Sequence, residues 1–214
     1  MQSRQSGEDM VEHLLMQVLQ ILGIDGYSRY STIISKALKL YMEFSSRYRI
    51  KSRRIMAYTA IYVALRLEGY AMTVNAFADK VGVDAKRLAS CYRAVQRVLG
   101  LTIPNPALHA YIDELVRWIE YGVNDRYGNN NVDTVRLKAE ACRLADDVVR
   151  SIMNGKGVNP VGVAAAILYL SLVDGERRAV SIKDLASISG VSMATISKRV
   201  EELRPFLKVC LTIE

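Results

Sequence analysis

The sequence of 214 residues has few of the residues that build metal sites and disulfides. Its three cysteines, Cys91, Cys142 and Cys210, are far apart and form no Cys-x-x-Cys pair. Neither histidine, His13 or His109, has a second ligand at metal-binding spacing. We therefore expect reduced thiols, no zinc ribbon, and no bound metal or other cofactor.

The sequence also lacks a long apolar run and the common catalytic motifs. Its longest apolar stretch, Val158–Val173, is short for a membrane span and is interrupted by Asn159 and Pro160. The N-terminal residues are polar, unlike a signal peptide. Neither a phosphate-binding Gly-x-x-x-x-Gly-Lys loop nor a Gly-x-Ser-x-Gly elbow is present. We expect a cytoplasmic protein that has no membrane partner and is not an enzyme.

The positive charge of the chain is unevenly distributed. The net charge is +7, and residues 1–104 contain 15 Lys and Arg against 8 Asp and Glu, whereas residues 105–214 contain 14 of each. All the excess positive charge therefore lies in the first half. Such asymmetry indicates a polyanionic partner, most often nucleic acid. Solubility alone is the alternative explanation.

Two blocks of sequence occur twice. Ala60–Gly69 aligns with Ala166–Gly175, and Val74–Val83 aligns with Ile182–Val191, with three identities in ten positions in each pair. Such internal repetition predicts two copies of one structural unit. Two prolines in Leu101–Pro106 favour a linker between them, and we place the domains at residues 1–102 and 103–214.

Hydrophobic spacing predicts an all-α fold of two tandem five-helix domains, with a buried third helix in each. A loop is expected at 122–133, where Gly and Asn are frequent. The helices are expected at 10–22, 31–48, 53–68, 74–81 and 84–99, and then at 107–121, 134–154, 159–173, 181–189 and 192–207.

Each copy ends in a helix-turn-helix pattern, in which an alanine precedes a glycine by four residues and an aliphatic residue follows it by six. The alanine allows close helix approach, the glycine permits a sharp turn, and the aliphatic residue packs the second helix on the first. Ser192 and Asp84 are expected as N-caps of the second helices. The pattern consists of Ala78, Gly82 and Leu88, and of Ala186, Gly190 and Ile196.

The second helix of each pair carries candidate DNA contacts, because short polar or basic side chains near its start can reach bases or phosphates. A purely structural helical hairpin with a solvated basic face is the alternative. In the first copy the candidates are Lys86, Arg87 and Arg93, with Arg97 further along. In the second copy they are Ser192, Ala194, Thr195, Ser197, Lys198 and Arg199.

A basic turn is predicted at Arg47–Arg54, where five of eight residues are basic and none is acidic. Phosphate contacts from such a turn add affinity but little sequence information. Lys36 and Lys39 are candidates to extend this surface, and a solvated loop is the alternative. The proposed phosphate-binding residues of the turn are Arg49, Lys51, Arg53 and Arg54.

Four stretches carry a family resemblance: Ala57–Leu67, Ser90–Arg93, Asn159–Leu170 and Val191–Leu203. Over about residues 10–207 the chain resembles the core of archaeal transcription factor B and general transcription factor IIB. This resemblance implies two cyclin-like domains. It also implies binding of promoter DNA together with TATA-binding protein, with the second helix-turn-helix reading an upstream element in the major groove.

The sequence departs from this family in two respects. Family members carry an N-terminal zinc ribbon and linker that engage RNA polymerase. No segment here matches them, so RNA polymerase is a secondary candidate partner after promoter DNA and TATA-binding protein. Ala194 and Ser197 also stand where the family commonly has valine and arginine. We predict a monomeric, nucleoid-associated initiation-factor paralogue or regulator. The alternative is a cyclin-like module that binds a transcription component without DNA.

Overall fold

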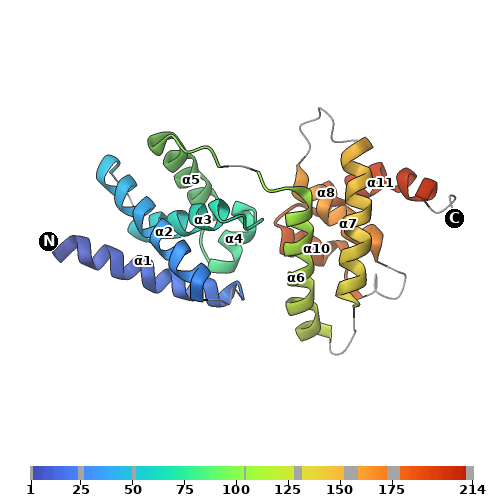
Figure 1. The fold of residues 1–214 in the computed structure, drawn as a ribbon, viewed down its shortest axis with the longest axis horizontal. Coiled ribbons are helices and arrows are strands. Elements are labelled where there is room, and N and C mark those ends of the chain that lie inside the picture. Colours follow the sequence, from blue (N-terminus) through green and yellow to red (C-terminus); the bar gives the residue numbers. More distant parts are fainter. Residues whose placement is uncertain are drawn as a thin grey trace. The chain divides into compact units, whose positions relative to one another are not determined.

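The computed structural model describes residues 2–23, 27–49, 52–103, 105–127, 132–151, 159–172 and 179–210 (Figure 1). Within these ranges the chain forms ten helices with defined bounds and no β-strand. The predicted all-α fold class is therefore confirmed. Packing divides the chain into two compact units, Met1–Tyr70 with Val74–Asn105, and Ala71–Thr73 with Pro106–Glu214.

The first unit is organised around the third helix. Within α3, every residue from Met56 to Arg66 is buried. Helices α1, α2 and α5 all pack against it, so the predicted central helix is confirmed. The helices of this unit are α1 (Gln2–Ile21), α2 (Tyr27–Arg47), α3 (Arg53–Leu67), α4 (Val74–Val81) and α5 (Ala85–Leu99).

The second unit repeats this arrangement around α8. All residues from Val161 to Leu168 are buried, and α6, α7, α10 and α11 pack against this helix. Asn159 caps its start by accepting a hydrogen bond from the Val161 N–H at 3.1 Å. The helices are α6 (Leu108–Tyr127), α7 (Thr134–Ser151), α8 (Pro160–Ser171), α10 (Ile182–Ser189) and α11 (Met193–Cys210).

Some helices are longer than the hydrophobic pattern predicts. Helix α1 begins at Gln2, whereas the prediction began at residue 10. The prediction missed the first turns because they are polar and carry no apolar stripe. Helix α6 continues to Tyr127 through the loop expected from residue 122. Gly122 weakens a helix by about 1 kcal/mol but does not end it. Helix α11 extends to Cys210 rather than to residue 207, with Pro205 inside it, where one backbone hydrogen bond is lost.

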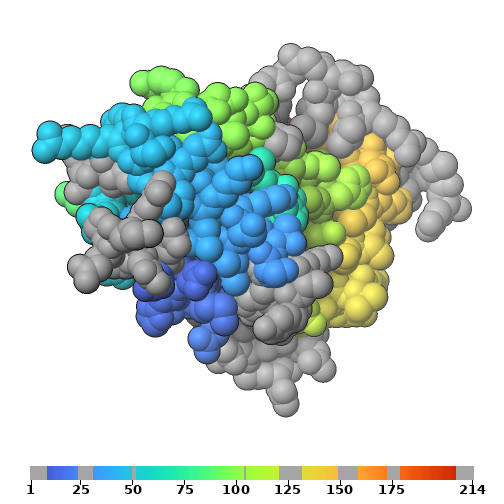
Figure 2. Space-filling model, turned by 60° about the vertical axis from the view of Figure 1, so that its left-hand side comes forward, coloured from blue at the N-terminus to red at the C-terminus, as the bar shows by residue number. Residues whose placement is uncertain are grey.

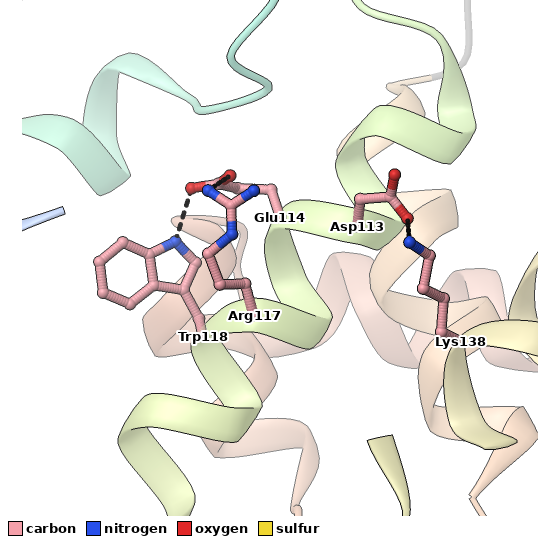
Figure 3. A network of polar contacts seen from close by, with 5 residues as sticks. All are labelled: Asp113, Glu114, Arg117, Trp118 and Lys138. Carbon is pink, nitrogen blue, oxygen red and sulfur yellow. Dashed lines mark hydrogen bonds and ion pairs between the residues drawn. The ribbon is translucent and has the colours of Figure 1, made fainter. Parts of the chain in front are cut away.

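Polar side chains on α6 form three contacts within the second unit (Figure 3). Glu114 is only 6% exposed and accepts a hydrogen bond from the Trp118 indole Nε1 at 2.9 Å. Arg117 Nη1 lies 3.3 Å from the same carboxylate. Lys138 of α7 pairs with Asp113 at 3.0 Å. Burying Glu114 requires such partners, because an unpaired carboxylate is costly in the protein interior.

Candidate nucleic-acid interface

The second helix-turn-helix pair consists of α10 and α11, joined by a tight turn at Gly190. Gly190 has φ 66°, in the left-handed region, and its N–H donates to the Ala186 carbonyl at 3.0 Å. Residues with a side chain are strained at this φ. The predicted role of Gly190 as the turn residue is therefore confirmed.

Side-chain caps hold the start of both helices in this pair. The Asp184 N–H donates to the Ser181 hydroxyl at 3.2 Å, and the Asp184 carboxylate accepts from the Ser181 N–H at 2.9 Å. At the start of α11, the Ser192 hydroxyl accepts from the Thr195 N–H at 3.2 Å. These bonds satisfy N–H groups that a helix start leaves without partners. The predicted N-cap role of Ser192 is confirmed.

The first turns of α11 present an exposed face with mixed chemistry. Ala194, Ser197 and Lys198 are exposed, whereas Ile196 and Val200 are buried and hold the opposite side of the helix. Met193 is also 52% exposed. Its place four residues before Ser197 puts both on one face, a spacing that could have added it to the candidates from sequence.

Two other candidates on α11 are engaged within the protein. Thr195 faces α8, where a Cβ on Gly162 would lie 3.4 Å from its Cγ2 atom. The side chain of Arg199 is 23% exposed, and its guanidinium pairs with Glu202. A contact of Arg199 with DNA would therefore require this ion pair to break. The DNA contacts of both residues stay predictions.

The first helix-turn-helix pair has the same construction. Gly82 has φ 66°, and the Val83 N–H donates to the Ala78 carbonyl at 3.0 Å. Asp84 caps α5, because its Oδ1 atom accepts from the Arg87 N–H at 2.7 Å. Both the turn glycine and the N-cap expected from sequence are confirmed.

Helix α5 separates a buried side from a cationic one. Leu88 and Val95 are fully buried. The basic residues all lie on the exposed side, where they can meet either solvent or a polyanion, and they comprise Lys86, Arg87, Arg93 and Arg97.

The basic turn lies between α2 and α3. Its described part lies at the surface of the first unit, at the end of α2 and the start of α3, light blue in Figure 2. Arg49, Arg53 and Arg54 are exposed. Arg54 Nη2 lies 3.4 Å from the Tyr58 hydroxyl, and its guanidinium lies 5.7 Å from the Tyr58 ring centre. Lys51 lies outside the described residues.

Not every cation near the turn adds free positive charge. Arg47 pairs with Glu43 at 2.9 Å. Lys36, a candidate to extend the surface, forms an ion pair with Glu68 of the segment after α3. Lys39 is exposed. An ion pair neutralises most of the field that a cation offers to a phosphate, so Lys36 contributes less than the sequence indicates.

A pocket of about 410 Å³ brings part of the basic turn and part of α5 together within the first unit. Ser52, the N-cap of α3, and Arg87 of α5 both line this pocket. Burial raises the pKa of the Cys91 thiol in this pocket, which favours the protonated, less nucleophilic form of the thiol. The lining residues are Phe44, Tyr48, Ser52, Ile55, Arg87, Ser90, Cys91 and Ala94.

Two kinds of site do not occur among the residues that the structure describes. No cluster of three or more His, Cys, Asp or Glu side chains in this part of the chain is placed to bind a metal ion. No described helix is both long and apolar enough to span a membrane.

The fold and these surfaces define an all-α protein with one helix-turn-helix pair in each compact unit. No protein-family model matches the chain. Curated proteins do match over most of it. "Transcription initiation factor IIB" of Pyrodictium occultum is 29% identical over 185 residues, which are 84% of this chain and 54% of the relative.

Two further relatives carry the same name. "Transcription initiation factor IIB 2" of Thermococcus kodakarensis is 30% identical over 171 residues, 78% of this chain and 51% of the relative. "Transcription initiation factor IIB 1" of Thermoplasma volcanium is 29% identical over 213 residues, 97% of this chain and 64% of the relative. The chain thus spans about half to two thirds of these relatives and resembles the core of transcription initiation factor IIB.

Proposed function

We propose that this chain binds promoter DNA together with TATA-binding protein, as a transcription initiation factor paralogue or as a regulator. The observation that carries the proposal is that each unit presents the second helix of a capped helix-turn-helix pair with basic or polar residues exposed. The relatives named transcription initiation factor IIB support a role in initiation.

The two units supply different parts of the proposed binding. In the first unit, Arg49, Arg53 and the exposed side of α5 provide cations for phosphates, which give affinity independent of sequence. In the second unit, the exposed start of α11 is the element that contacts base edges in the major groove.

The direct test is a gel-shift titration on TATA-containing promoter DNA, with and without archaeal TATA-binding protein. A slower complex that requires both proteins supports the proposal. Absence of that complex at low salt, where phosphate contacts are strongest, refutes it.

The role of the basic turn is tested by the salt dependence of the same complex. Replacing four basic residues by alanine should reduce the slope of log K against log salt by about 0.9 for each phosphate that is no longer neutralised, up to about 3.6. An unchanged slope would mean that the turn only adds solubility. The four residues are Arg49, Lys51, Arg53 and Arg54.

A matched control removes the same charge from the second unit. If only net charge mattered, both quadruple variants would weaken binding alike, whereas localised phosphate contacts predict weaker binding for the basic-turn variant alone. Circular dichroism should first confirm that both variants are folded. The control replaces the exposed cations Arg136, Lys138, Arg143 and Arg204.

The pocket in the first unit supports a second candidate, binding of a protein segment without DNA. Phe44 and Tyr48 give it apolar walls, and Arg87 provides one cation. Ala94→Phe would narrow this pocket from α5. Binding to purified TATA-binding protein or RNA polymerase in the absence of DNA, abolished by this substitution, would favour this candidate.

A further inference from the structure

The start of α11 exposes apolar side chains where a helix-turn-helix protein meets base edges. Met193 is 52% exposed at the first position of the helix, and Ala194 beside it is exposed as well. Met193 is not part of the buried core, which Ile196 and Val200 supply from the opposite side of the helix.

Three of the polar side chains around this apolar pair, Ser192, Thr195 and Arg199, form contacts within the protein. The hydroxyls of Ser192 and Thr195 lie 2.8 Å apart, and the Ser192 hydroxyl also caps the helix. Arg199, the first arginine of α11, pairs with Glu202. A bidentate contact with guanine needs an arginine or lysine extended toward the base, and Arg199 is held along its own helix instead.

The exposed face is held firmly in place. Gly162 of α8 lets α11 approach closely, with Thr195 at the contact. Met193 and Ser197 are four positions apart, as are Ala194 and Lys198, so the four side chains form one continuous face. Apolar atoms therefore lie at the end of the helix closest to the turn, and the cation of Lys198 lies one turn further along.

We propose that Met193 and Ala194 bind the C5-methyl groups of thymines in the major groove, so that α11 selects thymine-containing base pairs rather than guanine. Thymine is the base that presents a methyl group there, and apolar side chains are its natural partners. The exposed Ser197 hydroxyl lies beside them for a hydrogen bond with an adjacent base. This inference rests on the proposed function.

The test replaces thymine by deoxyuridine in the DNA upstream of the TATA box only. This change removes the methyl group and leaves the Watson–Crick edge and the phosphates intact. The complex with TATA-binding protein should weaken about fourfold for each methyl group that is contacted, the effect of removing one buried methyl-sized group. Equal affinity for both duplexes would overturn the inference. Formation of the complex would still support the proposed function in that case.

Two variants connect the effect to α11. Met193→Gln preserves length and exposure but removes apolar character, so it should reduce the preference for thymine by about fourfold for each methyl group that Met193 contacts. Val135→Gln is the control, because Val135 is 80% exposed near the start of α7. It should retain the full preference for thymine. A preference for thymine in Met193→Gln as strong as in the wild-type protein would overturn the assignment.

A selection from DNA with a randomised upstream flank provides an independent readout. Enrichment of thymine-containing positions at a fixed distance from the TATA box supports the inference. Enrichment of guanine would refute it and would indicate Lys198 as the residue that contacts bases. Failure of the wild-type protein to form any complex would refute both the inference and the proposed function.

Discussion

Replacing Glu114 by alanine should destabilise the second compact unit by about 2 kcal/mol. The carboxylate is buried in α6 and accepts a hydrogen bond from the Trp118 indole at 2.9 Å (Figure 3). Hydrogen bonds to charged groups contribute about 1.5–3 kcal/mol. Arg117 lies 3.3 Å away with its side chain 38% exposed, so solvent limits that ion pair to about 0.5 kcal/mol.

Glu114→Gln separates these contributions. The glutamine carbonyl still accepts from Trp118, but the negative charge facing Arg117 is removed. The cost should fall to about 1 kcal/mol or less, since a neutral hydrogen bond replaces a charge-assisted one. Glu120→Ala is the matched control, because Glu120 is exposed on the same helix. It should change stability by less than about 0.5 kcal/mol.

The assay is urea unfolding followed by tryptophan fluorescence. Trp118 is the single tryptophan of the chain, so the signal reports the second unit. With a slope of about 1–2 kcal/mol per molar urea for a unit of this size, Glu114→Ala should lower the midpoint by about 1–2 M. A stabilising role of the Glu114 carboxylate is refuted if Glu114→Ala behaves like Glu120→Ala, or if Glu114→Gln costs as much as Glu114→Ala.

Burial raises the pKa of the Cys91 and Cys142 thiols. Both thiols should therefore react more slowly with an aromatic disulfide reagent in the folded protein than in urea. The free energy of unfolding should also fall as the pH rises through the folded pKa of these thiols, because the unfolded thiols ionise more readily. Ser181→Ala should cost about 1 kcal/mol in thermal unfolding, because it removes the cap of α10. Gly162→Ala should change stability by less than about 0.5 kcal/mol, since helix propensity offsets a 3.4 Å contact with Thr195. Gly162→Val should cost about 1–3 kcal/mol by overpacking the same contact.

A specific experimental result would contradict each of these predictions. Rapid thiol reaction in the native protein would place the cysteines at an accessible surface. A Ser181→Ala variant as stable as wild type would show that water replaces the cap. Equal stability of Gly162→Ala and Gly162→Val would show that α8 and α11 separate without cost.

Features that depend on nearby residues were predictable from the sequence. The apolar third helices, the turn glycines Gly82 and Gly190, and the caps Asp84 and Ser192 all follow from spacing within a few residues. Local backbone geometry determines such features, because helix periodicity and positive φ require particular residue types at particular positions.

Features that depend on distant residues were decided by tertiary packing. The ion pair of Lys36 with Glu68 joins residues 32 positions apart, and it removes a cation that the sequence made a candidate. The pocket of the first unit places Ser52 near Arg87 only because α3 packs against α5. The sequence by itself therefore determined the all-α class, the repeat and the turns. Tertiary packing alone decided which charges and apolar groups stay exposed for a partner, because burial and pairing depend on which helices meet.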